Sequence, residues 1–170
     1  MLASRGTQGH ADERYEPPRG AKENPMPRFV VQKHFQNREE WHFDFMLECG
    51  GALITFSCGA PPDDANALPC LVRQLGSHRI EYLSYQGEIS GGRGWCEIHD
   101  RGTFEWLEPK APPDPAHCDL LDRLAVRLAG QKARGIYRLV RETTSGTDYG
   151  RMSQAPGKSP LATRCGEPGG

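Results

Sequence analysis

The chain lacks long apolar runs: only 36% of its 170 residues are hydrophobic, and its mean hydropathy is −0.66. A helix that crosses a bilayer needs about 20 consecutive apolar residues, so the sequence predicts no membrane span and no membrane partner. The N-terminus also lacks the apolar segment of a secretory signal. We therefore expect a cytoplasmic protein.

An excess of charge of either sign is also missing. The 21 Lys and Arg residues nearly balance the 22 Asp and Glu residues, which gives a formal net charge of −1. Bulk attraction to nucleic acid requires a strong positive field. Any nucleic-acid contact is therefore expected to be local, at a basic patch or a metal site.

Six cysteines are present, but none forms a Cys-x-x-Cys pair, so a structural zinc site of the ribbon type is not expected. Without a secretion signal, reduced thiols are favoured over disulfides. Most of the cysteines suit small apolar core positions. Cys58, between Ser57 and Gly59, is a candidate nucleophile, although the sequence assigns it no base.

The length fits one domain with tails. Residues 1–27 are polar and lack periodicity, which predicts a disordered arm. Residues 145–170 are similar in composition and predict a disordered C-terminal tail. The folded body is therefore expected over residues 28–144.

Within the body, short β-prone runs alternate with glycine turns, as is typical of a mainly β fold. We predict a small antiparallel β-barrel with short flanking helices, and a sandwich stays open as the alternative. Gly50-Gly51 joins the alternating run 41–47 to residues 53–56, which predicts a hairpin. Further strands are expected at residues 28–33, 71–75, 80–85, 95–99, 103–107, the latter part of 120–130, and 135–141.

Turns are expected at residues 91–94 and 100–102, where glycines interrupt the pattern. The tryptophans Trp41, Trp95 and Trp106 are interpreted as core residues rather than as platforms for stacked bases.

Three residues of metal-binding type lie close together in the sequence: His34, His42 and Asp44. His42 and Asp44 are two positions apart, so on a strand they point to the same face, while Phe43 and Phe45 point to the other. Two imidazoles and a carboxylate form a common ligand set for a catalytic divalent metal with open positions for water and substrate.

A His-x-Asp pair also fits a hydrogen-bonded polar face without metal, and the sequence does not fix where His34 points. His78 and Tyr82 are further candidates for a site. The other histidines are interpreted as packing or hydrogen-bonding residues, and the segment 38–40 as a solvated loop.

The order of motifs resembles the 3′-phosphoesterase domain found in bacterial ligase D proteins and as separate polypeptides. The matching segments cover nearly the whole body and are 28–34, 42–45, 47–48, 78–82, 85–89, 91–94, 100–104 and 135–141. The Gln-Lys-His, His-aromatic-Asp-Phe and His-x-x-Glu-Tyr motifs are specific as a set, although each alone is weak.

The resemblance implies a β-barrel that removes a 3′-terminal phosphate or trims a 3′-terminal ribonucleotide at a primer–template DNA end. It implies a divalent metal, typically Mn²⁺, on His34, His42 and Asp44. By the same resemblance His78 and Tyr82 contact the scissile phosphate, and Gln32 supports the site. This agrees with the chemistry of the residues, since such a metal polarises phosphoryl oxygens and His or Tyr donates hydrogen bonds.

The chain departs from the family at three positions. The family carries a basic residue at each of them, whereas this chain has Met46, Cys58 and Cys70. The spacing from His34 to His42 is also two residues longer than usual. Arg73 lies three positions from Cys70, which on a strand changes its face. Replacement cations are expected to come from other directions, and the candidates are Arg38, Arg79 and Arg93.

Two functions follow. The first is a metal-dependent phosphoesterase that heals 3′ ends in DNA repair. The second is a catalytically weakened barrel that binds a DNA end or a repair protein. A chain that consists of this domain alone neither ligates nor polymerises, so a separate ligase or polymerase is the expected partner.

Overall fold

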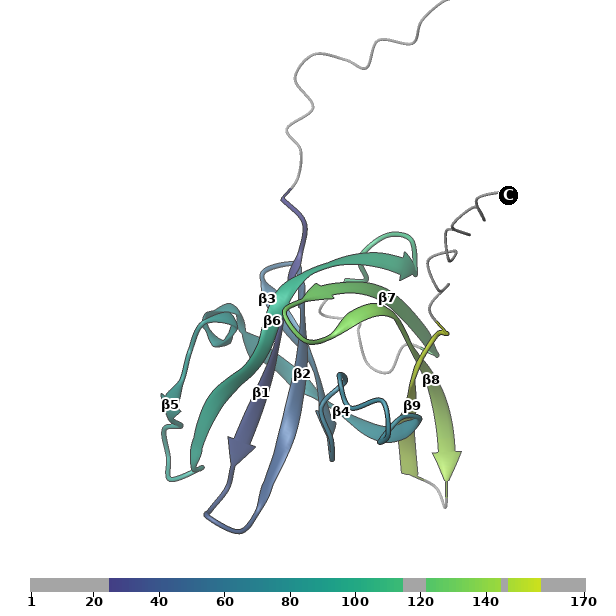
Figure 1. Cartoon of the computed structure of the whole chain (residues 1–170). Helices are drawn as coiled ribbons and strands as arrows, with labels where there is room; N and C mark the ends of the chain where they lie inside the picture. Colours follow the sequence, from purple (N-terminus) through teal and green to yellow (C-terminus); the bar gives the residue numbers. More distant parts are fainter. Residues whose placement is uncertain (1–24, 115–121, 145–146, 157–170) are drawn as a thin grey trace, which may run out of the picture.

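The computed structural model describes residues 25–114, 122–144 and 147–156 (Figure 1). Within them it contains nine strands and one short 3₁₀ helix. In chain order these are β1 (Arg28–Phe35), β2 (Trp41–Cys49), β3 (Ala52–Cys58), β4 (Cys70–Arg79), η1 (Ile80–Leu83), β5 (Gly87–Glu88), β6 (Trp95–Glu108), β7 (Arg123–Gly130), β8 (Arg134–Thr144) and β9 (Thr147–Gln154).

The strands form one antiparallel sheet that closes on itself. Their order is β1-β2-β3-β4-β9-β8-β7-β6-β5, and an additional pairing of β1 with β6 closes eight of them into a barrel. The long strand β6 makes closure possible, because its first part pairs with β1 and its second part with β7 (Figure 1). The predicted antiparallel β-barrel is thus confirmed, and closure leaves few edges exposed.

Side chains that point inward from alternate strand positions fill the barrel. Phe29, Val31, Phe43 and Phe45 are buried in this inner core, together with residues from β3 and from β7 to β9. Burying a side chain of this size stabilises the fold by roughly 1.5–3 kcal/mol. The alternation expected for residues 41–47 places Phe43 and Phe45 in this core, as predicted.

A second apolar cluster lies on the outside of the barrel. Val30, Met46 and Leu53 point outward, where Leu83 of η1 covers them and Ile80 packs beside them. The strand predicted at residues 80–85 is therefore wrong. Ile80 and Leu83 are three positions apart, the spacing that puts both on one side of a 3₁₀ turn. This turn is the only helix within the described residues, and it is far too short to cross a membrane.

The turn predicted at residues 100–102 is also wrong, because β6 runs through it without interruption. An irregularity in the β1–β6 register at this point turns Asp100 into the protein. Its buried carboxylate accepts hydrogen bonds from the backbone N–H groups of Arg101, Gln131, Lys132 and Ala133. Asp100 thus fixes the turn between β7 and β8 rather than forming a turn of its own.

The folded body extends beyond the boundary predicted at residue 144. Residues 147–154 form β9, which pairs with both β4 and β8 and completes the barrel. The expectation of a tail from residue 145 is therefore wrong for this segment. Most of the arm predicted over residues 1–27 lies outside the described residues, as do His10, His117, Cys118 and Cys165.

Trp41 does not lie in the core, because 47% of its surface is exposed. It stands beside Phe35 at the rim of the β1–β2 hairpin, and Phe35 stacks on Trp95 with their rings 4.7 Å apart. Trp106 does pack against the inner core. The interpretation of the tryptophans as core residues thus fails for Trp41, because the hairpin projects past the end of β3. Trp95 is half-buried and belongs to neither apolar cluster.

Asp100→Ala is predicted to lower the free energy of unfolding by about 2–4 kcal/mol, because four backbone donors lose a charged acceptor. Urea unfolding followed by circular dichroism measures this change. The matched control is Glu105→Gln, which breaks an exposed ion pair with Arg127 and is expected to cost below about 1 kcal/mol. Equal effects of the two variants would contradict the role assigned to Asp100.

Candidate metal centre

The pairing of β1 with β2 brings the three predicted metal ligands together on the outer face of the barrel. His34 lies directly opposite His42, and Gln32 lies opposite Asp44. Both pairs share the face of Val30 and Met46, because residues two apart on a strand point the same way. The backbone register alone therefore gathers two imidazoles and a carboxylate at one place.

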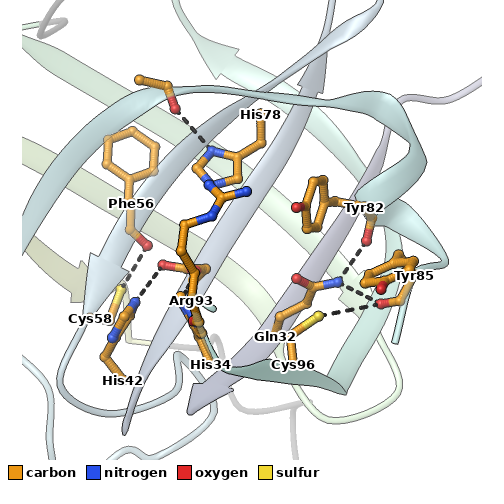
Figure 2. A network of polar contacts seen from close by, with 12 residues as sticks. Gln32, His34, His42, Phe56, Cys58, His78, Tyr82, Tyr85, Arg93 and Cys96 are labelled. Atoms are coloured by element: carbon orange, nitrogen blue, oxygen red, sulfur yellow. Dashed lines mark hydrogen bonds and ion pairs between the residues drawn. The ribbon is translucent and has the colours of Figure 1, made fainter. Parts of the chain in front are cut away.

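The ligand atoms of His34, His42 and Asp44 all lie within 4.8 Å of one another. Nδ1 of His34 is 3.5 Å from one Asp44 oxygen, and Nε2 of His42 is 3.2 Å from the other. Figure 2 shows the side chains of His34 and His42, which come from the two paired strands. Among the described residues this is the one group of its kind, and its donors suit a divalent transition metal.

Asp44 is the observation that favours a cation here. Its side chain is only 6% exposed, and its Oδ1 is buried without a hydrogen-bond partner despite the short distance to His42. An unsatisfied buried carboxylate oxygen is costly, whereas a bound cation would compensate it. The residues present therefore fit a metal ion.

The backbone prepares His34 for the same role. Nε2 of His34 lies 2.8 Å from the carbonyl oxygen of Arg93, so this nitrogen is the one that carries the proton and donates. In the neutral ring, Nδ1 then has its lone pair free on the side of Asp44. Orientation of a ligand histidine by a backbone carbonyl is a common feature of metal sites.

A glycine allows this carbonyl to reach His34. Gly94 has a φ of +87°, and a Cβ at this position would lie 1.7 Å from the carbonyl oxygen of Phe35. Only glycine fits so close to β1. The turn at residues 91–94 was predicted from its glycines, but nothing in the sequence indicated that its backbone orients His34.

The ligand cluster opens into a cleft of about 410 Å³ between β1, the end of β4, η1 and the turn before β6. The lining is mostly polar and consists of Gln32, His34, Asp44, Ser77, His78, Arg79, Tyr82, Ile89, Ser90 and Arg93. Of the residues predicted for the site, only His42 is not part of this lining. A polar, cationic cleft beside a metal-type cluster suits an anionic substrate.

His78 and Tyr82 lie side by side in the cleft, with ring centroids 5.6 Å apart. Nδ1 of His78 donates to the carbonyl oxygen of Gly76 at 2.9 Å, which leaves Nε2 for a ligand. Within the described residues the Tyr82 hydroxyl makes no hydrogen bond to protein. Both side chains therefore have polar atoms available to a bound anion.

Gln32 ties η1 to β1. Its Nε2 donates to the carbonyl oxygens of Tyr82 and Tyr85, each at 2.8 Å, and the residue is almost completely buried. Figure 2 shows both bonds, with the amide oxygen turned away from these carbonyls. Because both N–H groups are used, the orientation of the amide is fixed. Gln32 thus sets the distance of Tyr82 from the ligand cluster.

Cys58 does not have the surroundings of a nucleophile. It points into the inner core, where burial, followed by Cys70 and Asp44, raises the pKa of its thiol far above its ordinary value. A thiol of this kind stays protonated and inert at neutral pH. Cys58, Cys70 and Cys96 are free, as expected for reduced thiols.

Comparison with known proteins extends these observations. A family profile described as "DNA Ligase D 3′-phosphoesterase domain" matches residues 32–141, which is more than half of the chain. The chain belongs to this family. The match includes the ligand cluster, the cleft and the barrel from within β1 to within β8, so most of the fold and the candidate site lie in the matched segment.

Similar proteins include the "Multifunctional non-homologous end joining protein LigD" of Mycolicibacterium smegmatis, 31% identical over 66% of this chain, and that of Pseudomonas aeruginosa, 30% identical over 70%. The "Multifunctional non-homologous end joining DNA repair protein LigD" of Mycobacterium tuberculosis is 29% identical over 75%. The matched regions cover 15%, 14% and 18% of these relatives, so the chain corresponds to one part of each.

His42→Ala is predicted to weaken Mn²⁺ binding by at least about a hundredfold. Removing a residue that only hydrogen-bonds to a metal ligand already lowers metal affinity by about 10–100-fold, and removing a ligand itself should lower it more. Isothermal titration measures the affinity and the stoichiometry, which we expect to be one ion per chain. Tyr82→Phe is the matched control and should leave the affinity unchanged. Retained affinity in His42→Ala would refute the assignment of this ligand.

Proposed function

We propose that the chain is a divalent-metal-dependent phosphoesterase that removes a 3′-terminal phosphate, or a 3′-terminal ribonucleotide, from DNA ends. The observation that carries the proposal is the orphaned Asp44 oxygen between two imidazoles, at the base of a polar cleft. Membership of the ligase D 3′-phosphoesterase family supports a role in processing DNA ends during end joining. The 3′ end of a primer–template is the proposed substrate.

In the proposed reaction, water attacks phosphorus and the bond from phosphorus to the 3′ oxygen breaks. The leaving oxygen takes up a proton, which yields a 3′-hydroxyl end and inorganic phosphate. The hydroxyl of Tyr82 would donate a hydrogen bond to the phosphate. Nε2 of His78 would donate another when the ring is an imidazolium, because Nδ1 already donates to the Gly76 carbonyl. One of the two groups would supply the proton to the leaving oxygen. Gln32 would hold Tyr82 in place for this contact.

His34, His42 and Asp44 would hold the metal ion. When bound, the ion would neutralise phosphate charge and activate water. We propose Mn²⁺, since a mixed set of imidazole and carboxylate donors suits metals of intermediate character. The chain's own contribution is to hold the three ligands ready: β1 and β2 fix their positions, and the Arg93 carbonyl fixes the His34 tautomer.

The second candidate is a module that binds DNA ends without turnover, with a separate ligase or polymerase as its partner. It is favoured by the burial of Met46 and Cys58 and the partial burial of Cys70, which stand where the family resemblance led us to expect basic residues. Binding of metal and of a 3′-phosphorylated end without release of phosphate would support this candidate.

A primer–template with a 3′-phosphate is expected to release inorganic phosphate in the presence of Mn²⁺ and not in the presence of a chelator. His42→Ala should abolish release, because the metal is no longer held. Cys58→Ala should retain it, because this thiol is buried in the core. Loss of release in Cys58→Ala, with the fold intact, would point to a thiol mechanism instead.

Gln32→Leu is predicted to lower kcat by about tenfold or more while Mn²⁺ affinity stays within a few-fold of that of the original chain. The substitution keeps the volume but removes both donors to η1, so Tyr82 loses its fixed position. Steady-state kinetics and metal titration on the same preparation separate the two effects. A parallel loss of metal affinity would show that Gln32 acts at the metal instead.

A further inference from the structure

We propose that Arg79 and Arg93 form the phosphate clamp of the cleft, in place of basic residues that the family carries at other positions. The inference rests on the proposed function, since it names the groups that bind the substrate's terminal phosphate. It concerns this chain in particular, because it assigns the phosphate contact to two arginines that the sequence offered only as candidate replacement cations.

The three positions at which basic residues were expected do not reach the cleft. Met46 is fully buried in the outer cluster beneath η1. Cys58 is buried in the inner core, and Cys70 packs against the same core. None of these three side chains carries a charge or lines the cleft, so the positive charge for a phosphate has to come from elsewhere.

Arg93 lies on the same side of the cleft as the ligand cluster. Its backbone carbonyl accepts the hydrogen bond of His34, so its position is tied to a proposed metal ligand. Its guanidinium is anchored to Ser90, with Nε 2.8 Å from the carbonyl oxygen and Nη2 3.4 Å from the hydroxyl. Figure 2 shows the side chain running from beside His34 toward His78.

Arg79 lines the same cleft from the end of β4, directly after His78. Its guanidinium carbon lies 5.8 Å from the centroid of the Tyr82 ring, a distance at which a cation is attracted to the ring face. Arg79 thus lies next to both His78 and Tyr82, the two residues proposed to contact the phosphate. The two arginines line the cleft from different elements, so both are available to contact a tetrahedral anion bound there.

Neither guanidinium is neutralised by an acid within the described residues. Other arginines of the barrel, such as Arg127 and Arg151, form ion pairs with glutamates, whereas no ion pair involves Arg79 or Arg93. Asp44 is the one carboxylate in the lining of the cleft, and the proposed metal would neutralise it. The cleft therefore has a surplus of positive charge that suits a doubly charged phosphate.

The remaining arginines near the site do not line the cleft. Arg38 is exposed in the turn between β1 and β2. Arg73 is exposed on β4, where it pairs with Ser57, and neither residue belongs to the lining. Of the three replacement cations considered from the sequence, the structure thus brings two to the cleft and leaves Arg38 outside.

The test compares two oligonucleotides of the same sequence, one with a 3′-phosphate and one with a 3′-hydroxyl, in the presence of Mn²⁺. Fluorescence anisotropy with Ca²⁺ in place of Mn²⁺ measures binding separately from cleavage. The original chain should bind the phosphorylated end more tightly. The double variant Arg79→Ala/Arg93→Ala should lose this preference and lower kcat/KM by about a hundredfold or more, with Mn²⁺ affinity unchanged.

Arg38→Ala is the matched control and should behave like the original chain. Arg93→Lys should recover only part of the preference, because an ammonium lacks the paired donors of a guanidinium. Full preference for the phosphorylated end in the double variant would overturn the clamp and leave the phosphoesterase proposal standing. A preference that depends on both arginines, without any phosphate release by the metal-loaded original chain, would support the clamp and overturn the phosphoesterase.

Discussion

The antiparallel register between β1 and β2 is the constraint on which the candidate site depends. It places His34 opposite His42 and Gln32 opposite Asp44, all on the outer face of the barrel. A register slip of one residue would point these four polar side chains into the apolar core and expose the core aromatic side chains to water. The register is therefore held by the burial of Phe29, Phe43 and the other inner residues, and the chemistry on the outside depends on packing on the inside.

Apolar packing on the outside of the barrel positions η1, which carries Tyr82, the other part of the site. Val30 and Met46, neighbours of the polar pairs on the same strands, are covered by Leu83 of η1. That contact, together with the two hydrogen bonds of Gln32, holds η1 against the barrel and Tyr82 beside the cleft. Met46, which stands where a basic residue was expected, thus has an apolar packing role, and the cations of the cleft come from segments that flank η1.

Period-two alternation was sufficient to predict a mainly β fold, the hairpin at Gly50-Gly51 and the common face of His42 and Asp44, because each depends on local pattern. The pattern left a barrel and a sandwich open, because closure depends on the distant pairing of β1 with β6. The sequence did not fix the facing of His34, which depends on pairing between strands. It failed at residues 80–85, where a 3₁₀ turn and a strand both fit the apolar spacing, and at 147–154, where β9 is held largely by backbone pairing. The hydrogen bond from His34 to the Arg93 carbonyl could not be predicted from the sequence, since every residue has a backbone carbonyl.

The most direct test of the account is the location of a bound ion. Crystals grown with Mn²⁺, with anomalous diffraction measured above and below the manganese edge, would reveal its position. The account predicts one strong peak in contact with Nδ1 of His34, Nε2 of His42 and the Asp44 carboxylate. A peak elsewhere, with these three side chains unligated at saturating Mn²⁺, would contradict the metal centre and the phosphoesterase chemistry built on it.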